Sequence, residues 1–249
     1  MGILDGRVSI VTGGARGIGR AYCLGLAAEG SAVVVADLVD GTPVVEEIEA
    51  AGGKAIAVHT DVSDPASTEA LARAAAEHFS RIDVLVNNAA YFKQVKRGPF
   101  EELDVDEWDR AFHVNVRGVW LCCRAVYPAM KEQRYGKIIN VSSNTVWKGV
   151  PWFLHYVASK SALLGLSRAL AREVGEHNIA VNTIAPDLIP DEEMLTTRAT
   201  EHEMVIGQRV FKRTQTAEDM VGVVVFLAGP GSDFITGQSF LVNGGAHFQ

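Results

Sequence analysis

The sequence predicts a single α/β domain in which strands and helices alternate along the chain. A chain of 249 residues with 48% hydrophobic residues is large enough for one continuous core. Near the N-terminus, a β-branched apolar run is followed directly by a glycine-rich turn and then by a helical pattern. Further short apolar runs recur between helical patterns, without a linker, low-complexity segment or internal repeat. We therefore expect one domain over residues 1–249.

Composition and charge argue against several classes of protein. The formal net charge of -7 and the pI of about 5.5 argue against a nucleic-acid surface. The N-terminus lacks a charged leader followed by an apolar h-region, and no stretch approaches ~18 consecutive apolar residues. We therefore expect a cytoplasmic protein without a membrane partner. Cys23, Cys122 and Cys123 have no metal-ligand spacing, and we expect the adjacent Cys122 and Cys123 to be buried in an apolar helix rather than to form a redox pair. The seven histidines are scattered, so we predict no catalytic metal.

The first strand, turn and helix have the pattern of a dinucleotide site. Residues 7–12 are the predicted strand and residues 20–29 the helix. Glycines in the intervening turn let the backbone approach a diphosphate closely, while the N-terminus of the helix faces its negative charge. The turn residues expected to contact the cofactor are Gly13, Arg16, Gly17, Ile18 and Gly19.

The second predicted strand, residues 32–36, ends in Asp37, 18 positions after the last glycine of the turn. A carboxylate at this place suits hydrogen bonds to the adenosine ribose hydroxyls of NAD and repels a 2'-phosphate. The alternative is an aspartate that caps the next helix. Arg16 favours the opposite choice, since a guanidinium in the turn suits the phosphate of NADP. We expect NAD, because a carboxylate in direct contact with the ribose penalises the extra phosphate.

The next two strands also end in polar or small residues. Residues 54–59 lead to Asp61 and Val62, where Asp61 suits either the adenine amino group or a cap on the following helix, and the two roles are compatible. Residues 82–86 lead to Asn88 and Ala89, which leave room for a cofactor and tie neighbouring loops together. A simple turn is the alternative there.

A long helix is predicted over residues 106–130, and it carries Asn115 in an otherwise apolar stretch. A buried asparagine needs hydrogen-bond partners, and its amide is expected to disturb the helix locally and to hold a water beside Lys160. A purely structural hydrogen bond between helices is the alternative.

The stretch from 140 to 172 carries the expected chemistry. Ser143 follows the apolar strand 138–141, and Tyr156 and Lys160 stand four residues apart on one face of a helix. A free tyrosine has a pKa of about 10, and a nearby lysine cation favours the phenolate. A serine hydroxyl can hold the substrate oxygen while the tyrosine moves its proton. The pair alone is weak, because tyrosine and lysine at this spacing are common on solvated helices.

The C-terminal third completes the alternation. A strand at 179–184 is followed by a less regular segment, 187–213, that we expect to cover the site as a lid. A helix at 217–227 and a strand at 240–242 end the domain.

These motifs, in this order, resemble the short-chain dehydrogenase/reductase family over nearly the whole chain. The resemblance implies a three-layer, doubly wound Rossmann-like parallel sheet with strand order 3-2-1-4-5-6-7, usually in a homotetramer built on two long helices per subunit. It also implies that Tyr156 is the acid/base, that Lys160 lowers its pKa and binds the nicotinamide ribose, that Ser143 orients the substrate oxygen and that Asn115 holds a relay water. Pro186 and Ile189 are the cofactor residues expected after the sixth strand. The matching residues are Thr12, Gly13, Gly14, Ala15, Arg16, Gly17, Ile18, Gly19, Asp61, Val62, Asn87, Asn88, Ala89, Asn115, Ser143, Tyr156, Lys160, Asn182, Pro186, Phe234, Ile235, Thr236, Gly237 and Gln238.

The chain departs from the family pattern after Pro186. The family usually has a glycine there and then a threonine that contacts the carboxamide of the cofactor, but here Asp187 and Asp191 occupy those positions. Our hypothesis is that the two carboxylates add negative potential near the nicotinamide ring and favour NAD+. Solvent-facing turn carboxylates are the alternative. Thr196 or Thr197 is a candidate for the carboxamide contact. Ala90 and Asn243 replace the usual glycine and aspartate.

The expected substrate pocket is mostly aromatic and apolar, which suits a ring-bearing secondary alcohol or its ketone. The loop before Tyr156 is similar to that of family members acting on aryl or alicyclic alcohols, such as 1-phenylethanol dehydrogenases. An NADPH-dependent reductase of 3-oxoacyl thioesters is the second hypothesis, with Lys93, Lys96 and Arg97 at the cleft mouth for an acidic carrier. A dinucleotide-sensing protein without catalysis is the third. The residues expected to bind substrate are Tyr91, Phe92, Ser143, Asn144, Trp147, Trp152, Phe153, Tyr156, Leu188 and Met194.

Overall fold

The chain folds around one parallel β-sheet. The computed structural model describes residues 2–197 and 199–248, so the predicted domain boundaries at Met1 and Gln249, and Arg198 within the predicted lid, lie outside the described residues. The sheet of the described part has seven strands in the order β3-β2-β1-β4-β5-β6-β7, which confirms the predicted topology. The strands are β1 Val8–Thr12, β2 Ala32–Asp37, β3 Ala55–His59, β4 Val84–Asn87, β5 Gly136–Val141, β6 Ile179–Pro186 and β7 Ser239–Val242.

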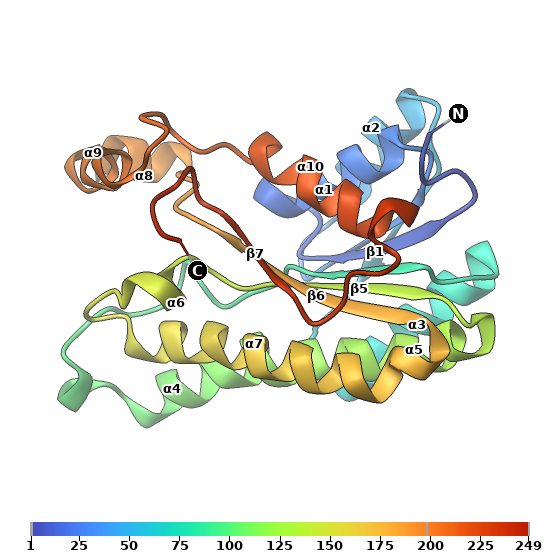
Figure 1. Cartoon of the computed structure of the whole chain (residues 1–249), viewed down its shortest axis with the longest axis horizontal. Helices are drawn as coiled ribbons and strands as arrows, with labels where there is room; N and C mark the ends of the chain where they lie inside the picture. Colours follow the sequence, from blue (N-terminus) through green and yellow to red (C-terminus); the bar gives the residue numbers. More distant parts are fainter. Residues whose placement is uncertain (1, 198, 249) are drawn as a thin grey trace.

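Helices cover both faces of the sheet (Figure 1). On one face lie α1 Gly17–Ala28, α2 Thr42–Ala50 and α10 Val221–Ala228, and on the other lie α3 Pro65–Phe79, α4 Val105–Phe112, α5 Val119–Gln133 and α7 Leu154–Val174. Short helices α6 Thr145–Lys148, α8 Glu192–Thr197 and α9 Ala199–Gln208 gather at one end of the molecule. Short 3-10 turns are formed by Phe100–Glu102, Gly175–His177, Glu218–Met220 and Pro230–Ser232.

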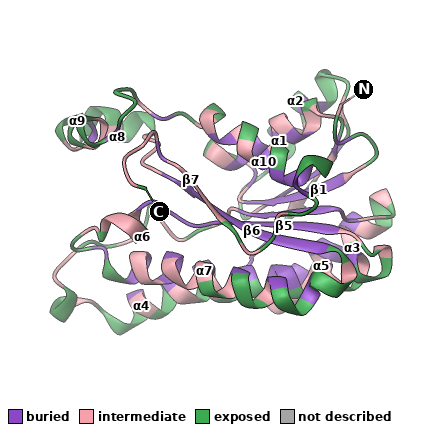
Figure 2. Ribbon diagram, in the orientation of Figure 1, coloured by how far each residue is buried: buried purple, intermediate pink, exposed green. Residues whose placement is uncertain are grey.

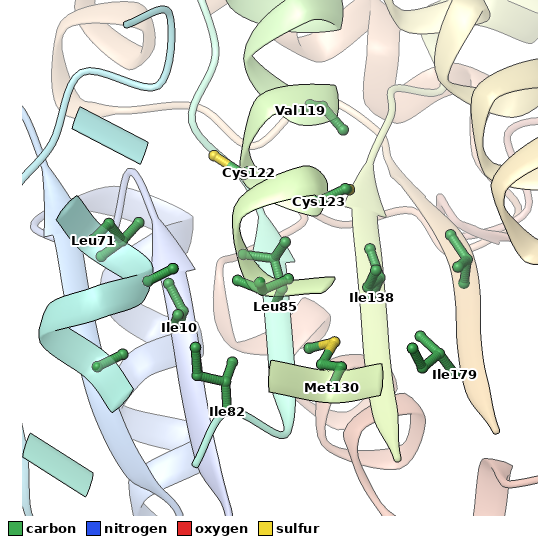
Figure 3. Packing of buried hydrophobic residues seen from close by; sticks show 14 of the residues in the cluster. Ile10, Leu71, Ile82, Leu85, Val119, Cys122, Cys123, Met130, Ile138 and Ile179 are labelled. Atoms are coloured by element: carbon green, nitrogen blue, oxygen red, sulfur yellow. The ribbon is translucent and has the colours of Figure 1, made fainter. Parts of the chain in front are cut away.

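Two apolar clusters, one on each face, hold the layers together. Strands β1, β4, β5 and β6 are buried along their whole length, as expected for parallel strands with helices on both sides (Figure 2). On the α3 and α5 side, Leu71, Met130 and Ile138 pack with Cys122 and Cys123 (Figure 3). All three cysteines are free and buried, as predicted for Cys122 and Cys123.

The structure confirms the helix predicted over residues 106–130 and the local disturbance expected at Asn115. The helix consists of α4, a π-helical segment His113–Gly118 and α5. Asn115 lies in the π-helical segment, where its side-chain amide bonds to groups outside the helix. Single π-helical turns inside α-helices are rare and occur frequently at functional sites.

The lid segment is more regular than predicted. Residues 192–197 form α8 and residues 199–208 form α9, because glutamate, methionine, leucine and alanine favour helices and neither helix holds a proline or a glycine before Gly207. The frequent threonines of this stretch made it look irregular in the sequence.

All strands point the same way, so their carboxyl ends meet at one edge of the sheet. That edge brings together residues that are far apart in the sequence: Gly13, Asp37, Asn88, Ser143 and Asp187 follow or end β1, β2, β4, β5 and β6. Within the described ranges, no helix combines the length and apolar character needed to cross a membrane.

Candidate active site

Helix α7 and the end of β5 place three reactive groups together. Tyr156 is 6% exposed and Lys160 2%, and Ser143, just after β5, is 8% exposed. The Ser143 side chain lies near enough to the phenol of Tyr156 to act on its pKa, and its hydroxyl forms a hydrogen bond of 3.0 Å with that of Thr145. The Lys160 ammonium donates to the backbone oxygen of Val141 at 2.7 Å and lies 5.9 Å from the centre of the Tyr156 ring. A phenol and a hydroxyl in this arrangement can exchange a proton with an alcohol or carbonyl oxygen that binds between them.

We expected Lys160 to lower the pKa of Tyr156, but the pKa is raised by the surrounding protein. Burial raises the pKa of Tyr156 well above 10, while the Ser143 side chain acts in the opposite direction. Burial also lowers the pKa of Lys160 to about 8. Desolvation therefore dominates the pKa of both side chains, because both are almost completely removed from water.

Asn115 ties the π-helical segment to its surroundings. Its side-chain oxygen accepts from the backbone nitrogen of Tyr91 at 2.7 Å, and its amide nitrogen donates to the Tyr91 carbonyl at 3.2 Å and to the Ser159 hydroxyl at 3.0 Å. The structural hydrogen bond between helices, our alternative for this residue, is therefore present through Ser159. The water beside Lys160 stays a prediction.

The glycine turn forms a cradle in which side chains would clash. A Cβ on Gly19 would lie 1.9 Å from the Gly13 oxygen, and one on Gly13 would lie 3.0 Å from the Cα of Ala89. Among the described residues, no side chain caps the N-terminus of α1, and a Cβ at Gly17 would meet no atom within 4 Å. The first backbone N–H groups of the helix are thus accessible to an anionic diphosphate.

Neighbouring side chains hold this cradle in place. The Asn88 amide donates to the backbone oxygens of Thr12 and Gly13, both at 3.0 Å, so the strand end ties adjacent loops together as predicted. The carboxylate of Asp37 accepts from the backbone nitrogens of Ala15 at 3.0 Å and Val39 at 3.2 Å. It therefore lies beside the glycine turn, and its contact with a ribose stays a prediction.

The predicted cap by Asp61 is wrong. Asp64 caps α3 by accepting from the Ala66 nitrogen at 3.0 Å. Asp61 instead forms a local turn with Ser63, accepting from its nitrogen at 2.8 Å and its hydroxyl at 2.7 Å. The expected contact between Asp61 and adenine stays a prediction, as does the role of Val62.

Aromatic side chains line one side of the candidate catalytic tyrosine. The ring of Phe153 stacks on that of Tyr156, with centroids 4.5 Å apart, and the ring of Phe92 lies 5.3 Å from Tyr156. The Arg97 guanidinium lies 4.5 Å from the centre of the Phe153 ring. We call Phe92, Phe153 and the Tyr156 ring the aromatic wall.

Two other aromatic residues predicted to bind substrate are not part of the aromatic wall, and their contact with substrate stays a prediction. The Tyr91 hydroxyl donates to the buried carboxylate of Glu107 in α4, at 2.8 Å, so its phenol is engaged away from Tyr156. Trp152 is 66% exposed. The predicted pocket residues Trp147, Leu188 and Met194 are half-buried, and their contact with substrate stays a prediction.

The hypothesis about Asp187 and Asp191 is corrected by the structure. The Asp187 side chain is 3% exposed and paired with Lys148 at 2.7 Å and Arg209 at 2.8 Å, so its charge is compensated and does not face solvent. Asp191 is an exposed turn carboxylate paired with Lys93. Thr196 and Thr197 are exposed and donate to carbonyls within α8, which does not support a carboxamide contact.

The chain is similar over nearly its whole length to several known proteins. A family model described as enoyl-(acyl carrier protein) reductase matches residues 13–247. A 3-oxoacyl-[acyl-carrier-protein] reductase of Synechocystis is 36% identical over 98% of each chain. The BbsD subunit of the (2S)-[(R)-hydroxy(phenyl)methyl]succinyl-CoA dehydrogenase of Thauera aromatica is 33% identical over 98% of each chain. A crystal structure of a protein from Sinorhizobium meliloti, described as a short-chain alcohol dehydrogenase, has a TM-score of 0.91 and 34% identity, and the match covers 98% of this chain and 97% of the other.

The chain belongs to the short-chain dehydrogenase/reductase family. It is therefore an oxidoreductase that uses a nicotinamide dinucleotide, which accepts or donates the hydride when bound. The glycine cradle, the uncapped N-terminus of α1 and the nearby Asp37 fit such a cofactor.

Within this family site, sequence reasoning missed two residues that contact Asp187. Lys148 and Arg209 lie 39 and 22 positions from it in the sequence, so no local spacing indicates either contact. A usable signal was Asp187 itself, because a carboxylate at the end of a buried strand needs a cationic partner. Asn243, the other departure, donates to the Asn144 oxygen at 3.1 Å and so supports the segment after Ser143. Among the described residues, no cluster of three or more His, Cys, Asp and Glu side chains is arranged to hold a metal ion.

Proposed function

We propose that the protein is an NAD(H)-dependent oxidoreductase that interconverts a ring-bearing, apolar secondary alcohol and its ketone. The aromatic wall is the observation that carries this proposal. Phe92 and Phe153 present two rings beside the phenol of Tyr156. Because aromatic rings pack well against one another, a substrate whose carbinol carbon bears a ring would place its oxygen near Tyr156 and Ser143.

In this proposal Tyr156 takes the proton from the alcohol, or returns it to the ketone, at its phenolic oxygen. Ser143 donates a hydrogen bond to the substrate oxygen and orients it. Lys160 contributes its positive charge and binds the nicotinamide ribose, and Asn115 supports the relay through a water. The bound oxidised nicotinamide adds a positive charge that favours the phenolate, which matters because burial alone raises the pKa of Tyr156.

The preference for NAD rests on Asp37. Its carboxylate lies at the end of β2 beside the glycine turn, and the charge would repel a 2'-phosphate. Arg16 is exposed at the start of α1 and remains the residue that would favour NADP. We expect the carboxylate to dominate because a carboxylate in direct contact with the ribose would penalise the extra phosphate.

A reductase of 3-oxoacyl thioesters is the second candidate. It is supported by the 3-oxoacyl-[acyl-carrier-protein] reductases among the relatives, including one of Staphylococcus aureus at 35% identity over 96% of this chain. The basic loop proposed for an acidic carrier is engaged, since Lys93 pairs with Asp191 and Arg97 with Glu201 of the lid. The BbsD relative's name describes a substrate that is both a phenyl carbinol and a thioester. We therefore propose that the enzyme recognises the ring of its substrate rather than an acyl carrier.

A dinucleotide-sensing protein without catalysis is the third candidate, and the presence of Asn115, Ser143, Tyr156 and Lys160 together argues against it. We also propose a cytoplasmic homotetramer, as the family resemblance implies.

The test is reduction of NAD+ and NADP+, followed at the nicotinamide absorbance, across aryl, alicyclic, sugar and hydroxyacyl-thioester secondary alcohols. We expect turnover with NAD+ on ring-bearing alcohols and a loss of at least about 100-fold in Tyr156→Phe. Faster turnover of hydroxyacyl thioesters, or a preference for NADP+, would favour the second candidate. Tight NAD binding without turnover of any alcohol would favour the third.

A further inference from the structure

Asp187 joins two segments that are far apart in the sequence and close to the candidate site. Its Oδ1 accepts from the Asn144 amide at 3.0 Å and the Lys148 ammonium at 2.7 Å, and both residues belong to the segment that begins with Ser143. Its Oδ2 accepts from the Arg209 guanidinium at 2.8 Å, just after α9 of the lid. One carboxylate therefore contacts both the serine segment, residues 143–148, and the lid, residues 187–213. Helix α6 and the two lid helices lie at the same end of the molecule (Figure 1).

Arg209 also fastens the two ends of the lid to each other. It is 2% exposed, and besides its bond to Asp187 it donates to the backbone oxygens of Leu188 at 2.8 Å and Arg213 at 2.9 Å. Gln215, just beyond the lid, accepts from the Asp187 nitrogen at 3.1 Å. We call the two ends of the lid, residues 187–188 and 209–213, its base. Hydrogen bonds of the buried Arg209 hold the base together, whereas Asp191 and Glu201 in the rest of the lid form exposed ion pairs.

The carboxylate of Asp187 and its two cationic partners, Lys148 and Arg209, are costly to separate. Burial raises the pKa of Asp187, but the hydrogen bonds from Lys148, Asn144 and Arg209 outweigh it and bring the pKa below its usual range. The carboxyl is therefore ionised at neutral pH. A buried carboxylate that loses one cationic partner is left poorly compensated, so a movement of either segment is resisted by the other.

We propose that Asp187 is a positioning residue that couples the place of Ser143 to the base of the lid. Asn144 transmits the contact, since it follows Ser143 directly and is also bonded to the Pro186 oxygen through its backbone, at 2.8 Å. When the lid base is in place, Ser143 is held at Tyr156. When it loosens, the serine segment loosens with it. Glycine, the usual residue here in the family, has no side chain to make this connection.

The test is hydrogen–deuterium exchange of the full-length protein, read separately for the serine segment and for the lid. Asp187→Asn keeps the size of the side chain and removes its charge, and we expect faster exchange in both segments, on the order of tenfold. Lys148→Met changes only the serine segment, and by reciprocity it should speed exchange in lid residues 199–213 as well. Lys148→Arg should restore much of the protection.

A matched control is Lys137→Met. Lys137 is a buried lysine of β5 whose ammonium lies 2.8 Å from Asp233. Like Lys148 it pairs with a carboxylate, but it lies at the amino end of the strand, away from Ser143. We expect it to leave exchange in the lid unchanged. Faster exchange confined to the substituted segment would overturn the coupling. If Asp187→Asn fails to fold by circular dichroism, the effect of Lys148→Met on the lid decides alone.

The catalytic arm uses the alcohol that the substrate panel identifies. We expect Lys148→Met to lower kcat several-fold with a smaller change in KM, because Ser143 is displaced in the bound complex, while Lys137→Met keeps kcat. Loosening of both segments with an unchanged kcat would show that Ser143 is not positioned through Asp187. Hydrogen–deuterium exchange is measured without substrate. Its result therefore tests the coupling even if the proposed substrate class is wrong.

Discussion

Lys160 holds its ammonium group in a buried position, and we predict that its replacement stabilises the fold while it destroys activity. Burial lowers the pKa of Lys160 from 10.5 to about 8, so the charge costs about 3 kcal/mol at neutral pH. Lys160→Met removes that cost but also the bond to the Val141 oxygen, which is worth roughly 2 kcal/mol. We expect a gain of about 1 kcal/mol in the free energy of unfolding at pH 7, measured by urea titration, with a loss of activity of at least ~100-fold.

The pH dependence gives a second check on the same variant. Between about pH 8 and 10.5 the unfolded chain carries the Lys160 proton and the folded chain does not, so wild-type stability rises with pH in this window. The advantage of Lys160→Met should therefore shrink as pH rises. Lys54→Met, at an exposed lysine, is the control and should change stability by less than about 0.5 kcal/mol. A variant less stable than wild type at pH 7 would contradict the prediction.

At the residue scale, spacing in the sequence predicted the proximity of side chains that lie on the same helix. It did not predict contacts between side chains that come from different segments. Tyr156 and Lys160 share a helix face, so their proximity follows from a separation of four residues. The sign of the pKa shift at Tyr156 did not follow, because it depends on how completely the layers of the fold exclude water. The partners of Asp187 come from distant segments and needed the structure.

At the scale of elements, two exposed ion pairs connect the loop after β4 to the lid. Lys93 pairs with Asp191, and Arg97 pairs with Glu201 at 3.0 Å. Exposed pairs contribute roughly 0.2–1 kcal/mol each, so we expect Lys93→Ala to raise KM about two- to fivefold with little change in kcat. The effect should fade as ionic strength rises, because salt screens the pair in the wild type.

The matched control for this change is Arg124→Ala, which removes the exposed pair with Glu69 on α5 and α3. We expect its KM to equal that of the wild type at every salt concentration. Steady-state kinetics at low and high salt check both variants. Equal effects of the two substitutions would mean that the lid does not depend on its ion pairs.

The elements themselves were predictable where sequence patterns are local and strong. Short β-branched runs that lead into glycine, aspartate or asparagine marked β1, β2 and β4 correctly to within a few residues. The π-helical segment was not predictable in form, because it is set by the bonds of Asn115 to Tyr91 and Ser159. A polar residue in an apolar helix indicated only that some irregularity was expected there.

At the scale of the whole molecule, the order of the strands followed from the family resemblance rather than from periodicity. Parallel strands buried on both faces read as continuous apolar runs, which carry no information about which strand is the neighbour. The order β3-β2-β1-β4-β5-β6-β7 gathers the polar strand ends from β1, β2, β4, β5 and β6 at one edge. The site is thus a consequence of topology, and the sequence supplied only its separate parts.

The proposed tetramer makes a prediction about α5. Trp120 is 48% exposed on this helix, beside a surface hollow lined by Phe112, Val116 and Leu166 from the neighbouring helical segments. An interface tryptophan typically contributes about 2 kcal/mol or more, and a two-fold interface contains it twice. Trp120→Glu should therefore weaken that interface by about 4 kcal/mol, close to a thousandfold, and yield dimers. Ile3→Glu, at an apolar residue that is 55% exposed near the N-terminus, should keep the wild-type mass. Light scattering after size-exclusion chromatography measures the mass directly, and a Trp120→Glu protein that keeps the wild-type mass would place the assembly on other surfaces.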